Sequence, residues 1–436
     1  MTQPQPVIVV GAGLAGAVMA CYLARAGRRV DVYEKRSDPR QGGADHGRSI
    51  NLALSTRGLH ALREIGLAED VLKSSVLMRG RMIHSPIGKL AFQPYGKDDS
   101  EALHSVSRAG LNRLLVEAAA RYETVRLFFG RRCTGLNSQG RAVEFGEETA
   151  EAEAVVGADG AYSAVRGWMQ RQDRFDYRQE YLSHGYKELT IPAGPGGAYR
   201  MEKHALHIWP RGRFMLIALP NRDGTFTGTL FAPFDGPDGF AALQTEADVT
   251  TYFRERFPDA AALAPELAWD FFSNPTGSLV TVRCQPWRIG RAMLIGDACH
   301  AVVPFLGQGM NAAFEDCTVL HECLQRHSWR WDHATADYES RRKVHADALA
   351  DLCIENYQEM RDRTASPWFL LQKRMAVLLH RVFPRWYLPL YTMVEFTRIP
   401  YADAVRRARV QDRIVWAVAL GLLALLTAAI VAFRIW

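Results

Sequence analysis

The sequence has few cysteines, and none of them is arranged as a metal ligand. The seven cysteines of the 436-residue chain are scattered, odd in number and without a C-x-x-C pair, which argues against the usual zinc sites and against the disulfide framework of a secreted domain. His204 and His207 form an H-x-x-H motif without a third ligand nearby, and strand alternation predicts an exposed strand pair there. We therefore expect no metal and a reducing compartment.

The excess of one charge sign over the other is also small. Lys and Arg total 53 against 47 Asp and Glu, a net charge of +6, far from the dense basic stripe of a nucleic-acid-binding protein. The apolar fraction of 48% and the charged fraction of 23% are typical of globular proteins and exclude a collagen-like or disordered chain. The first residues have no positive cap before a short apolar run, so no signal peptide is expected.

A strand–helix–strand pattern occupies the first 34 residues. Val7 to Val10 is a short apolar run, typical of a buried parallel strand. The segment 11–16 has the form G-x-G-x-x-G and leads into a helical pattern, and a second strand, Val30 to Tyr33, ends at Glu34. Because all the parts occur in the right order, a dinucleotide-binding unit is favoured over an ordinary glycine turn.

Each glycine of this motif has a physical task in such a unit. Gly11 permits the tight turn, Gly13 lets a pyrophosphate approach the backbone, and Gly16 allows close packing of helix on strand. The helix N-terminus offers N–H groups and a positive dipole end to the phosphates, and Glu34 would accept hydrogen bonds from the adenosine ribose. The motif alone does not separate FAD from NAD.

Three downstream segments favour FAD. Asp159-Gly160 follows an apolar run and resembles the D-G motif of flavoprotein hydroxylases, and Gly296-Asp297 ends a second apolar strand. The segment 304–311, P-F-L-G-Q-G-M-N, then feeds a helix whose N-terminus can stabilise negative charge on a reduced flavin. No second G-x-G-x-x-G is present, so a nicotinamide donor is expected to visit transiently.

Between residues 204 and 231 the apolar period changes to two. Three strands are predicted, at 204–209, 214–219 and 225–231, separated by turn residues. We expect an α/β fold: a Rossmann-type FAD-binding domain with an inserted antiparallel β-sheet substrate domain, a C-terminal helical region and a terminal transmembrane helix. The expected divisions are an FAD-binding domain at 1–182 (with 76–100 contributing to the substrate site) and 278–340, a substrate domain at 183–277, a helical region at 341–409 and an anchor at 414–433.

The predicted anchor is an apolar run near the C-terminus. Residues 414–433 carry no charge, and only Gly421 and Thr427 lie outside the apolar set. As a helix this segment would span about 30 Å, the hydrocarbon thickness of a bilayer, whereas a buried core helix would normally show a polar face. Five arginines and one aspartate lie between 404 and 436. The apolar run predicts membrane anchoring by the C-terminus, and the positive-inside tendency of the flanking arginines then predicts that the catalytic body lies on the cytoplasmic side.

Longer motifs resemble one family of flavin hydroxylases. These are G-R-S-I-N-L-A-L-S at 47–55, Q-P-Y-G at 93–96 and E-N-Y-Q-E-M at 355–360. Together with 304–311 they resemble the kynurenine 3-monooxygenase family, and the resemblance extends from residue 7 to about residue 405. One departure is Leu306, where some members carry histidine or an aromatic residue, which affects the contacts beside the substrate ring.

The resemblance implies site residues at matching positions. Arg81 matches the arginine that holds the substrate carboxylate. The other substrate positions are Tyr95, Phe305, Asn356, Glu359, Met360 and Tyr391. The FAD positions, from the motifs and the resemblance together, are Gly11, Gly13, Leu14, Ala15, Gly16, Glu34, Arg36, Arg48, Ala53, Arg108, Asp159, Asp297, Gly309, Met310 and Asn311.

The implied reaction is the hydroxylation of L-kynurenine to 3-hydroxy-L-kynurenine, in tryptophan catabolism, with bound FAD and with NADPH and O₂ as co-substrates. A flavin hydroperoxide would deliver the hydroxyl group, so no side chain is expected to act as a catalytic acid or base. The implied partners are L-kynurenine, NADPH, O₂ and a lipid bilayer, without nucleic acid. The alternatives are an FAD-dependent hydroxylase of another anionic aromatic substrate and a non-catalytic flavin-binding protein.

Overall fold

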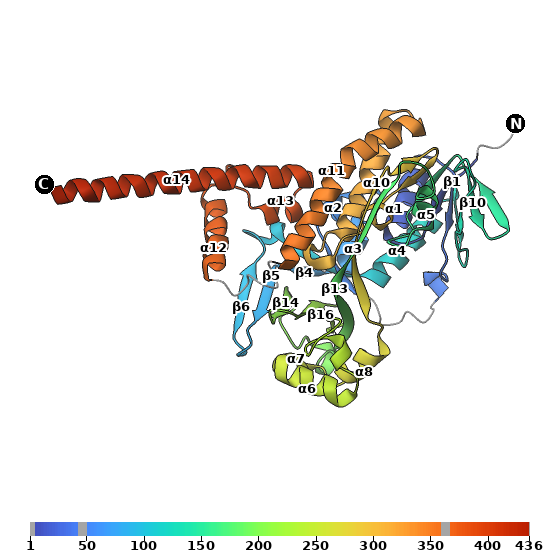
Figure 1. The fold of residues 1–436 in the computed structure, drawn as a ribbon. Helices are drawn as coiled ribbons and strands as arrows, with labels where there is room; N and C mark the ends of the chain where they lie inside the picture. The colour runs from blue at the N-terminus through green and yellow to red at the C-terminus, as the bar shows by residue number, and fades with distance from the viewer. Residues whose placement is uncertain (1–4, 42–49, 359–366, 436) are drawn as a thin grey trace.

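The computed structural model describes residues 5–41, 50–358 and 367–435. A six-stranded sheet forms the core of one part of the molecule (Figure 1). Its strands are, in order, β18 (Arg288–Ile289), β19 (Ala292–Leu294), β12 (Ala154–Gly157), β1 (Val7–Val10), β2 (Val30–Tyr33) and β8 (Val125–Phe128). All neighbours are parallel except β18 and β19. The two predicted strands of the dinucleotide-binding unit are confirmed with their expected bounds.

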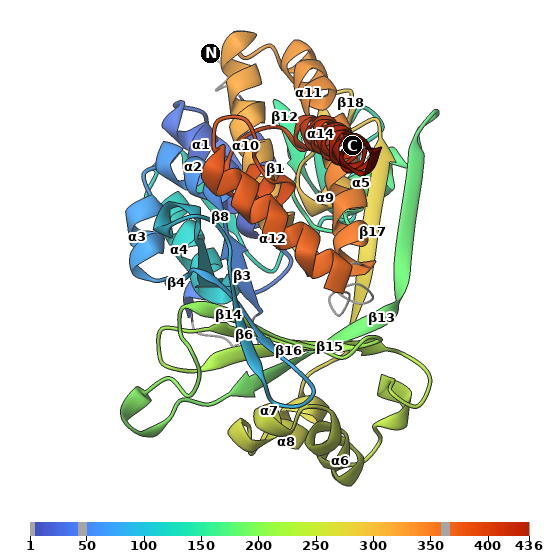
Figure 2. The ribbon, with the colours of Figure 1, turned by 90° about the vertical axis from the view of Figure 1, so that its left-hand side faces the viewer.

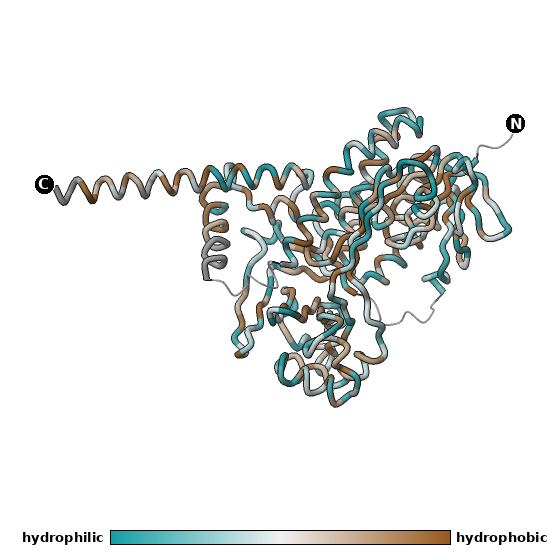
Figure 3. The backbone as a smooth tube through the Cα atoms, viewed as in Figure 1, coloured by the Kyte–Doolittle hydropathy of each residue, from teal (hydrophilic) through white to brown (hydrophobic). Residues whose placement is uncertain are grey.

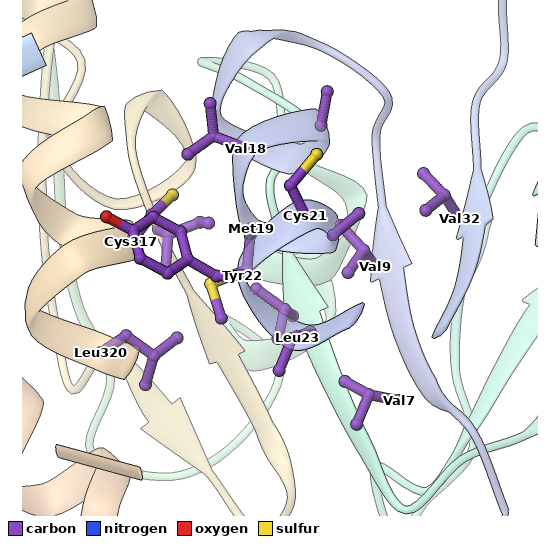
Figure 4. Packing of buried hydrophobic residues seen from close by; sticks show 14 of the residues in the cluster. Val7, Val9, Val18, Met19, Cys21, Tyr22, Leu23, Val32, Cys317 and Leu320 are labelled. Carbon is purple, nitrogen blue, oxygen red and sulfur yellow. The ribbon is translucent and has the colours of Figure 1, made fainter. Parts of the chain in front are cut away.

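Helix α1 (Leu14–Arg25) is buried along most of its length because it is covered on two sides. It packs against both α4 (Arg108–Ala120) and α10 (Gly309–Arg326). Figure 4 shows Tyr22 of α1 beside the α10 side chains in this core, and the Tyr22 hydroxyl lies 2.9 Å from Thr318 Oγ1. Burial of each large apolar side chain contributes roughly 1.5–3 kcal/mol, so this contact fixes α10 firmly to α1.

A seven-stranded sheet forms the second part of the molecule. Its strands are, in order, β17 (Gly277–Gln285), β13 (Asp176–Ile191), β16 (Phe226–Pro233), β15 (Met215–Pro220), β14 (Ala205–Pro210), β5 (Gly80–His84) and β6 (Leu90–Pro94). The pairs are antiparallel except β14 with β5. Figure 2 shows the long strands β13 and β17 side by side, reaching from this sheet towards the first part.

The three strands predicted between 204 and 231 are present, each beginning one residue later than expected. Three helices cover one face of their sheet (Figure 1): α6 (Glu246–Arg256), α7 (Pro258–Leu263) and α8 (Leu267–Ser273). The sheet also recruits β5 and β6 from the region 76–100, so segments far apart in the sequence form one surface.

Smaller sheets and short helices accompany the two large sheets. Two three-stranded sheets have the orders β3 (Asn51–Leu54), β7 (Leu103–Ser107), β4 (Val76–Met78) and β11 (Glu148–Glu151), β10 (Ala142–Phe145), β9 (Gly135–Leu136). The remaining helices of the main body are α2 (Thr56–Glu64), α3 (Ala68–Lys73), α5 (Ala164–Met169) and α9 (Asp297–His300).

The C-terminal region is helical, as predicted. It contains α11 (Trp331–Gln358), α12 (Pro367–Val382), α13 (Leu390–Phe396) and α14 (Tyr401–Ile435). The first turns of α14 pack against α11 and α13, and the rest of α14 extends away from the body (Figure 1).

The structure contradicts the predicted transmembrane anchor. The apolar run 414–433 is the second half of α14, and the same helix carries Arg406, Arg409 and Arg413 in its first half. Figure 3 shows this change from hydrophilic to hydrophobic residues along the helix. Among the residues that the structure describes, no helix combines the length and the apolar character needed to cross a bilayer. The predicted span includes positions 422, 423, 426, 432 and 433, whose side chains lie outside the described residues. The expected bilayer partner and membrane localisation are therefore corrected.

The predicted exposure of the H-x-x-H motif is also wrong. His207 is buried, with 1% exposure, because β5 and α7 bring His84 and Asp259 against it. Asp259 Oδ2 lies 2.6 Å from His84 Nδ1, and His84 Nε2 lies 2.8 Å from His207 Nδ1. His207 Nε2 then lies 2.8 Å from the Glu202 carbonyl oxygen. Burial lowers the pKa of His207 from 6.5 to about 4, so the ring is neutral near pH 7.

A buried network of charges joins α10 to its surroundings. Arg342 of α11 donates to Glu315 Oε2 at 2.6 Å and to Asp316 Oδ1 at 2.7 Å. Arg57 of α2 donates to Glu315 Oε1 at 2.6 Å, and Asp316 Oδ2 lies 2.5 Å from His300 Nε2. Burial would raise the pKa of both carboxyls, but the facing cations hold them below their ordinary values.

His300 and Asp316 also form, with Cys299, a buried group of three side chains whose ligating atoms lie within 4.8 Å of one another. The Asp316 carboxylate is already satisfied by Arg342, His300 and the Gly296 N–H. We therefore interpret the group as part of the charge network.

The buried histidine predicts acid sensitivity. Between pH 6.5 and pH 4 the unfolded chain binds a proton that folded His207 does not, so the free energy of unfolding should fall by up to about 3 kcal/mol as the pH drops through this window. His207→Gln should be less stable than wild type at pH 7, and the difference should shrink towards pH 4 in urea titrations. The exposed His333→Gln serves as the control. A difference between wild type and His207→Gln that is independent of pH would contradict this account.

Removal of the central arginine should be costly. Arg342→Met leaves two buried carboxylates without their shared cation and should lower the free energy of unfolding by about 3–5 kcal/mol. The neighbouring Arg341→Met removes a partly exposed pair with Glu322 and should cost less than about 1 kcal/mol. Urea denaturation of both variants makes the comparison, and equal losses would show that the buried network does not carry this stability.

Candidate functional site

The glycine turn after β1 has the shape that a phosphate-binding turn needs. Gly11 has a φ of +102°, and a Cβ added there would lie 2.6 Å from the Ala158 carbonyl oxygen. A Cβ on Gly16 would lie 1.9 Å from the Gly11 carbonyl oxygen, whereas a Cβ on Gly13 would meet no atom within 4 Å. Gly11 and Gly16 are thus required by close packing, while Gly13 faces open space.

The first turn of α1 completes this anion site. Gly13 is the N-cap of α1 and provides no side-chain hydrogen bond to the helix. The next two residues, Leu14 and Ala15, are only partly buried. The N–H groups and the positive dipole end of α1 therefore face a region that a pyrophosphate fits.

Glu34 lies next to this turn at the end of β2. Its Oε2 accepts a hydrogen bond from the Ala12 N–H at 2.9 Å, and its Oε1 accepts from the Arg36 N–H at 2.9 Å. Burial would raise the pKa of Glu34, but these N–H groups and the Arg36 guanidinium hold it below its ordinary value. The carboxylate is ionised and fixed, as an acceptor for two ribose hydroxyls needs to be.

The two predicted aspartates differ in their surroundings. Asp159 accepts from Ser163 Oγ at 2.5 Å and from the Ala164 N–H at 2.6 Å, so its carboxylate holds the start of α5. Asp297 is exposed and is the first residue of α9. Of the two, Asp297 has the carboxylate that is accessible to a cofactor.

The turn at 307–311, in the third predicted FAD segment, is held against the end of β3. Gly307 has a φ of +70°, and α10 begins at Gly309 without a side-chain cap. Asn311 Nδ2 donates to the Ala53 and Gly307 carbonyl oxygens, and its Oδ1 accepts from the Ser55 N–H. The Asn311 side chain is thus committed to joining the end of β3 with this turn, while Met310 stays partly exposed.

The three predicted arginines of the FAD site differ in their surroundings. Arg36 is largely exposed and pairs with Glu34 at 3.1 Å. Arg108 is exposed at the start of α4. Arg48 lies outside the described residues.

Three predicted substrate residues from separate segments, the buried Tyr95 and the partly buried Arg81 and Tyr391, meet in one cluster. Arg81 belongs to β5, Tyr95 directly follows β6, and Tyr391 belongs to α13. The Arg81 Cζ lies 5.0 Å from the Tyr391 ring centroid and 5.7 Å from the Tyr95 ring centroid, and the two rings stack at 5.7 Å. Within the described part of the chain, Arg81 Nε and the Tyr95 hydroxyl are buried without a hydrogen-bond partner. Because such groups are costly when unsatisfied, the cluster suits an anionic ligand.

An aromatic cluster lies on the turn that leads to α10. Phe305 is 8% exposed, and its ring stacks on Tyr357 at 4.4 Å and lies 5.0 Å from Phe231. Asn356 Nδ2 donates to the Phe305 carbonyl oxygen at 2.7 Å, so Asn356 fixes the backbone that carries this ring. Glu359 and Met360 lie outside the described residues.

Two buried polar residues were not among the predicted site residues. Gln308 Nε2 donates to Glu395 Oε2 at 2.5 Å, and the Tyr401 hydroxyl donates to Gln308 Oε1 at 2.9 Å. Burial raises the pKa of Glu395 to about 8, although Arg81, Gln308 and Arg57 oppose this. The spacing of Glu395 four residues after Tyr391 was the signal in the sequence, since it puts both side chains on one helix face.

Comparison with known proteins agrees with this geometry. Residues 5–352 match the family model described as an FAD binding domain. The chain is 50% identical over 423 residues to the kynurenine 3-monooxygenase of Myxococcus xanthus, covering 95% of this chain and 91% of that protein. It is 44% identical over 415 residues to the kynurenine 3-monooxygenase of Dictyostelium discoideum, covering 92% of this chain and 90% of that protein.

The fold is also that of solved oxygenases. The tetrameric 2-methyl-3-hydroxypyridine-5-carboxylic acid oxygenase superposes with a TM-score of 0.70 at 22% identity, covering 84% of this chain and 95% of that one. At this identity the likeness concerns the fold alone. The two curated relatives match nearly the full length of the chain at 50% and 44% identity. The chain therefore belongs to the kynurenine 3-monooxygenase family of FAD-dependent aromatic monooxygenases.

Proposed function

We propose that this protein hydroxylates L-kynurenine to 3-hydroxy-L-kynurenine with NADPH and O₂. The observation that carries the proposal is the Arg81 guanidinium beside the Tyr95 and Tyr391 rings, whose buried Nε has no partner in the described part of the chain. The names of the curated relatives supply the substrate, kynurenine. Kynurenine is an amino acid, and its carboxylate is the ligand that such a guanidinium binds.

Arg81 would bind and orient the substrate. A guanidinium can grip a carboxylate through two parallel N–H bonds, and the stacked rings of Tyr95 and Tyr391 lower the local dielectric, which strengthens the contact. Phe305, fixed by Asn356 and Tyr357, would offer an aromatic surface to the substrate ring. Two separate contacts, one at each end of the substrate, would determine which ring carbon is presented.

FAD would be held by backbone groups at several turns. The turn 11–16 and the start of α1 would bind the pyrophosphate. Glu34 would bind the adenosine ribose, and Asp297 would bind the ribitol and pyrophosphate region. When bound, FAD supplies the redox chemistry by accepting hydride from NADPH and activating O₂. The N-terminus of α10 would favour negative charge on the ring system through its dipole. The single glycine fingerprint supports transient binding of NADPH.

The proposal includes the division of the chain. Residues 1–182 and 278–340 would form the FAD domain, 183–277 the substrate domain with a contribution from 76–100, and 341–409 the helical region. The proposed roles of Arg48, Glu359 and Met360 rest on the sequence motifs. The other residues that would contact FAD include Arg36, Ala53, Arg108, Asp159, Gly309, Met310 and Asn311.

One assay tests the proposed function. The FAD-loaded protein should consume NADPH rapidly only when L-kynurenine is present, and mass spectrometry should find a product heavier by one oxygen atom. Another anionic aromatic acid, such as anthranilate, serves as the comparison substrate. NADPH consumption that is independent of L-kynurenine, with hydrogen peroxide as the only product, would contradict the proposal.

The arginine contact has its own test. Arg81→Ala should weaken L-kynurenine binding about 10- to 150-fold, because a charged hydrogen bond contributes about 1.5–3 kcal/mol, while the FAD absorbance spectrum stays unchanged. Arg79→Ala is a matched control, since Arg79 is exposed and pairs with Asp99 at 2.7 Å. Equal affinity of wild type and Arg81→Ala in calorimetry would remove Arg81 from this role.

A further inference from the structure

We propose that Glu395 receives the α-ammonium group of the substrate, so that Arg81 and Glu395 together select an amino acid over a simple carboxylic acid. The inference rests on the proposed function and deepens it, because it assigns a second charged contact in the same site. Among the proposed substrate residues that the structure describes, Arg81 is the only charged one.

The position of Glu395 follows from α13. Tyr391 and Glu395 are four residues apart on this helix, so their side chains lie on the same face. The Tyr391 ring lies 5.0 Å from the Arg81 Cζ. Glu395 is completely buried, with 0% exposure, and its charge acts on Arg81, Tyr95 and Tyr391. Glu395 is therefore next to the anion-binding cluster.

The hydrogen bonds of Glu395 leave one oxygen for a ligand. Gln308 Nε2 donates to Oε2 at 2.5 Å. The Tyr401 hydroxyl donates to Gln308 Oε1, which fixes the amide so that its NH₂ group faces Glu395. In the described part of the chain Oε1 has no hydrogen-bond partner. A fully buried carboxyl oxygen without a donor is unfavourable, and an ammonium group would satisfy it.

The charges of the cluster match those of a free amino acid. The cations that act on Glu395 are Arg81 and Arg57, and Arg57 is already engaged by Glu315. Among the described ion pairs, Arg81 and Glu395 do not pair with each other. A zwitterion would supply a carboxylate to Arg81 and an ammonium to Glu395 and would add no net charge to the buried site. A desamino acid would supply only the negative charge, next to a second carboxyl group.

The protonation of Glu395 provides a signature of the contact. Because burial raises the pKa of this carboxyl to about 8, it is mostly neutral at pH 7 in the empty site. An ammonium group against Oε1 would favour the ionised form. Binding of the amino acid should then release a proton, whereas binding of the desamino acid should not.

The test compares two ligands on the FAD-loaded protein without NADPH, so that only binding is measured. The ligands are L-kynurenine and its desamino analogue, 4-(2-aminophenyl)-4-oxobutanoate. Calorimetry should show at least about tenfold tighter binding of L-kynurenine to wild type. In Glu395→Gln the affinity for L-kynurenine should fall about tenfold or more, while that for the analogue stays equal or rises. Equal weakening of both ligands would overturn the proposal, since it would mean that Glu395 only holds Gln308.

A second measurement needs no variant. Titrations of wild type at pH 7 in buffers of different ionisation enthalpy should show that about one proton is released per L-kynurenine bound and none per analogue. Equal proton release for the two ligands would overturn the role of Glu395. If L-kynurenine does not bind to wild type at all, the proposed function fails as well, whereas binding without preference over the analogue refutes this inference alone.

Discussion

Arg342 lies between two buried carboxylates of α10, and both functional parts of the molecule depend on that arrangement. On one side, Asp316 accepts from the Gly296 N–H at 2.9 Å, which holds the turn that presents Asp297. On the other side, Glu315 holds Arg57, and Arg57 donates to the Val394 and Ile399 carbonyl oxygens at the end of α13. The turn that carries Asp297 and the helix α13 that carries Tyr391 are therefore fixed to the same helix by one network of buried charges.

The two proposed binding regions use different chemistry. The cofactor region consists mainly of backbone: glycine turns, uncapped helix starts and one ionised carboxylate, Glu34. The proposed substrate region consists of side chains, and Arg81, Tyr95 and Glu395 each have one buried polar atom without a hydrogen-bond partner in the described part of the chain. Backbone groups at helix starts bind phosphate without regard to sequence detail, whereas buried unsatisfied side chains discriminate strongly among ligands.

Local patterns predicted the parts of the fold that local forces determine. The strand bounds of β1 and β2 and the three strands of the substrate sheet followed from apolar periodicity, and the glycine turn followed from its motif. The burial of His207 did not, because it depends on Asp259, which is distant in sequence. The meeting of Arg81 with Tyr391 was implied only by resemblance to a family. The apolar run at 414–433 predicted an anchor that the described helices do not support. Glu395 was missed because its spacing of four residues from Tyr391 becomes informative only once both are known to lie on one helix, α13.

The most direct measurement of the central claim is a crystal structure of the FAD-loaded protein with L-kynurenine. The account predicts that the substrate carboxylate lies within hydrogen-bond distance of the Arg81 guanidinium and the Tyr95 hydroxyl, with the aromatic ring towards Phe305 and the start of α10. A carboxylate bound elsewhere, with Arg81 still unpaired, would contradict the account.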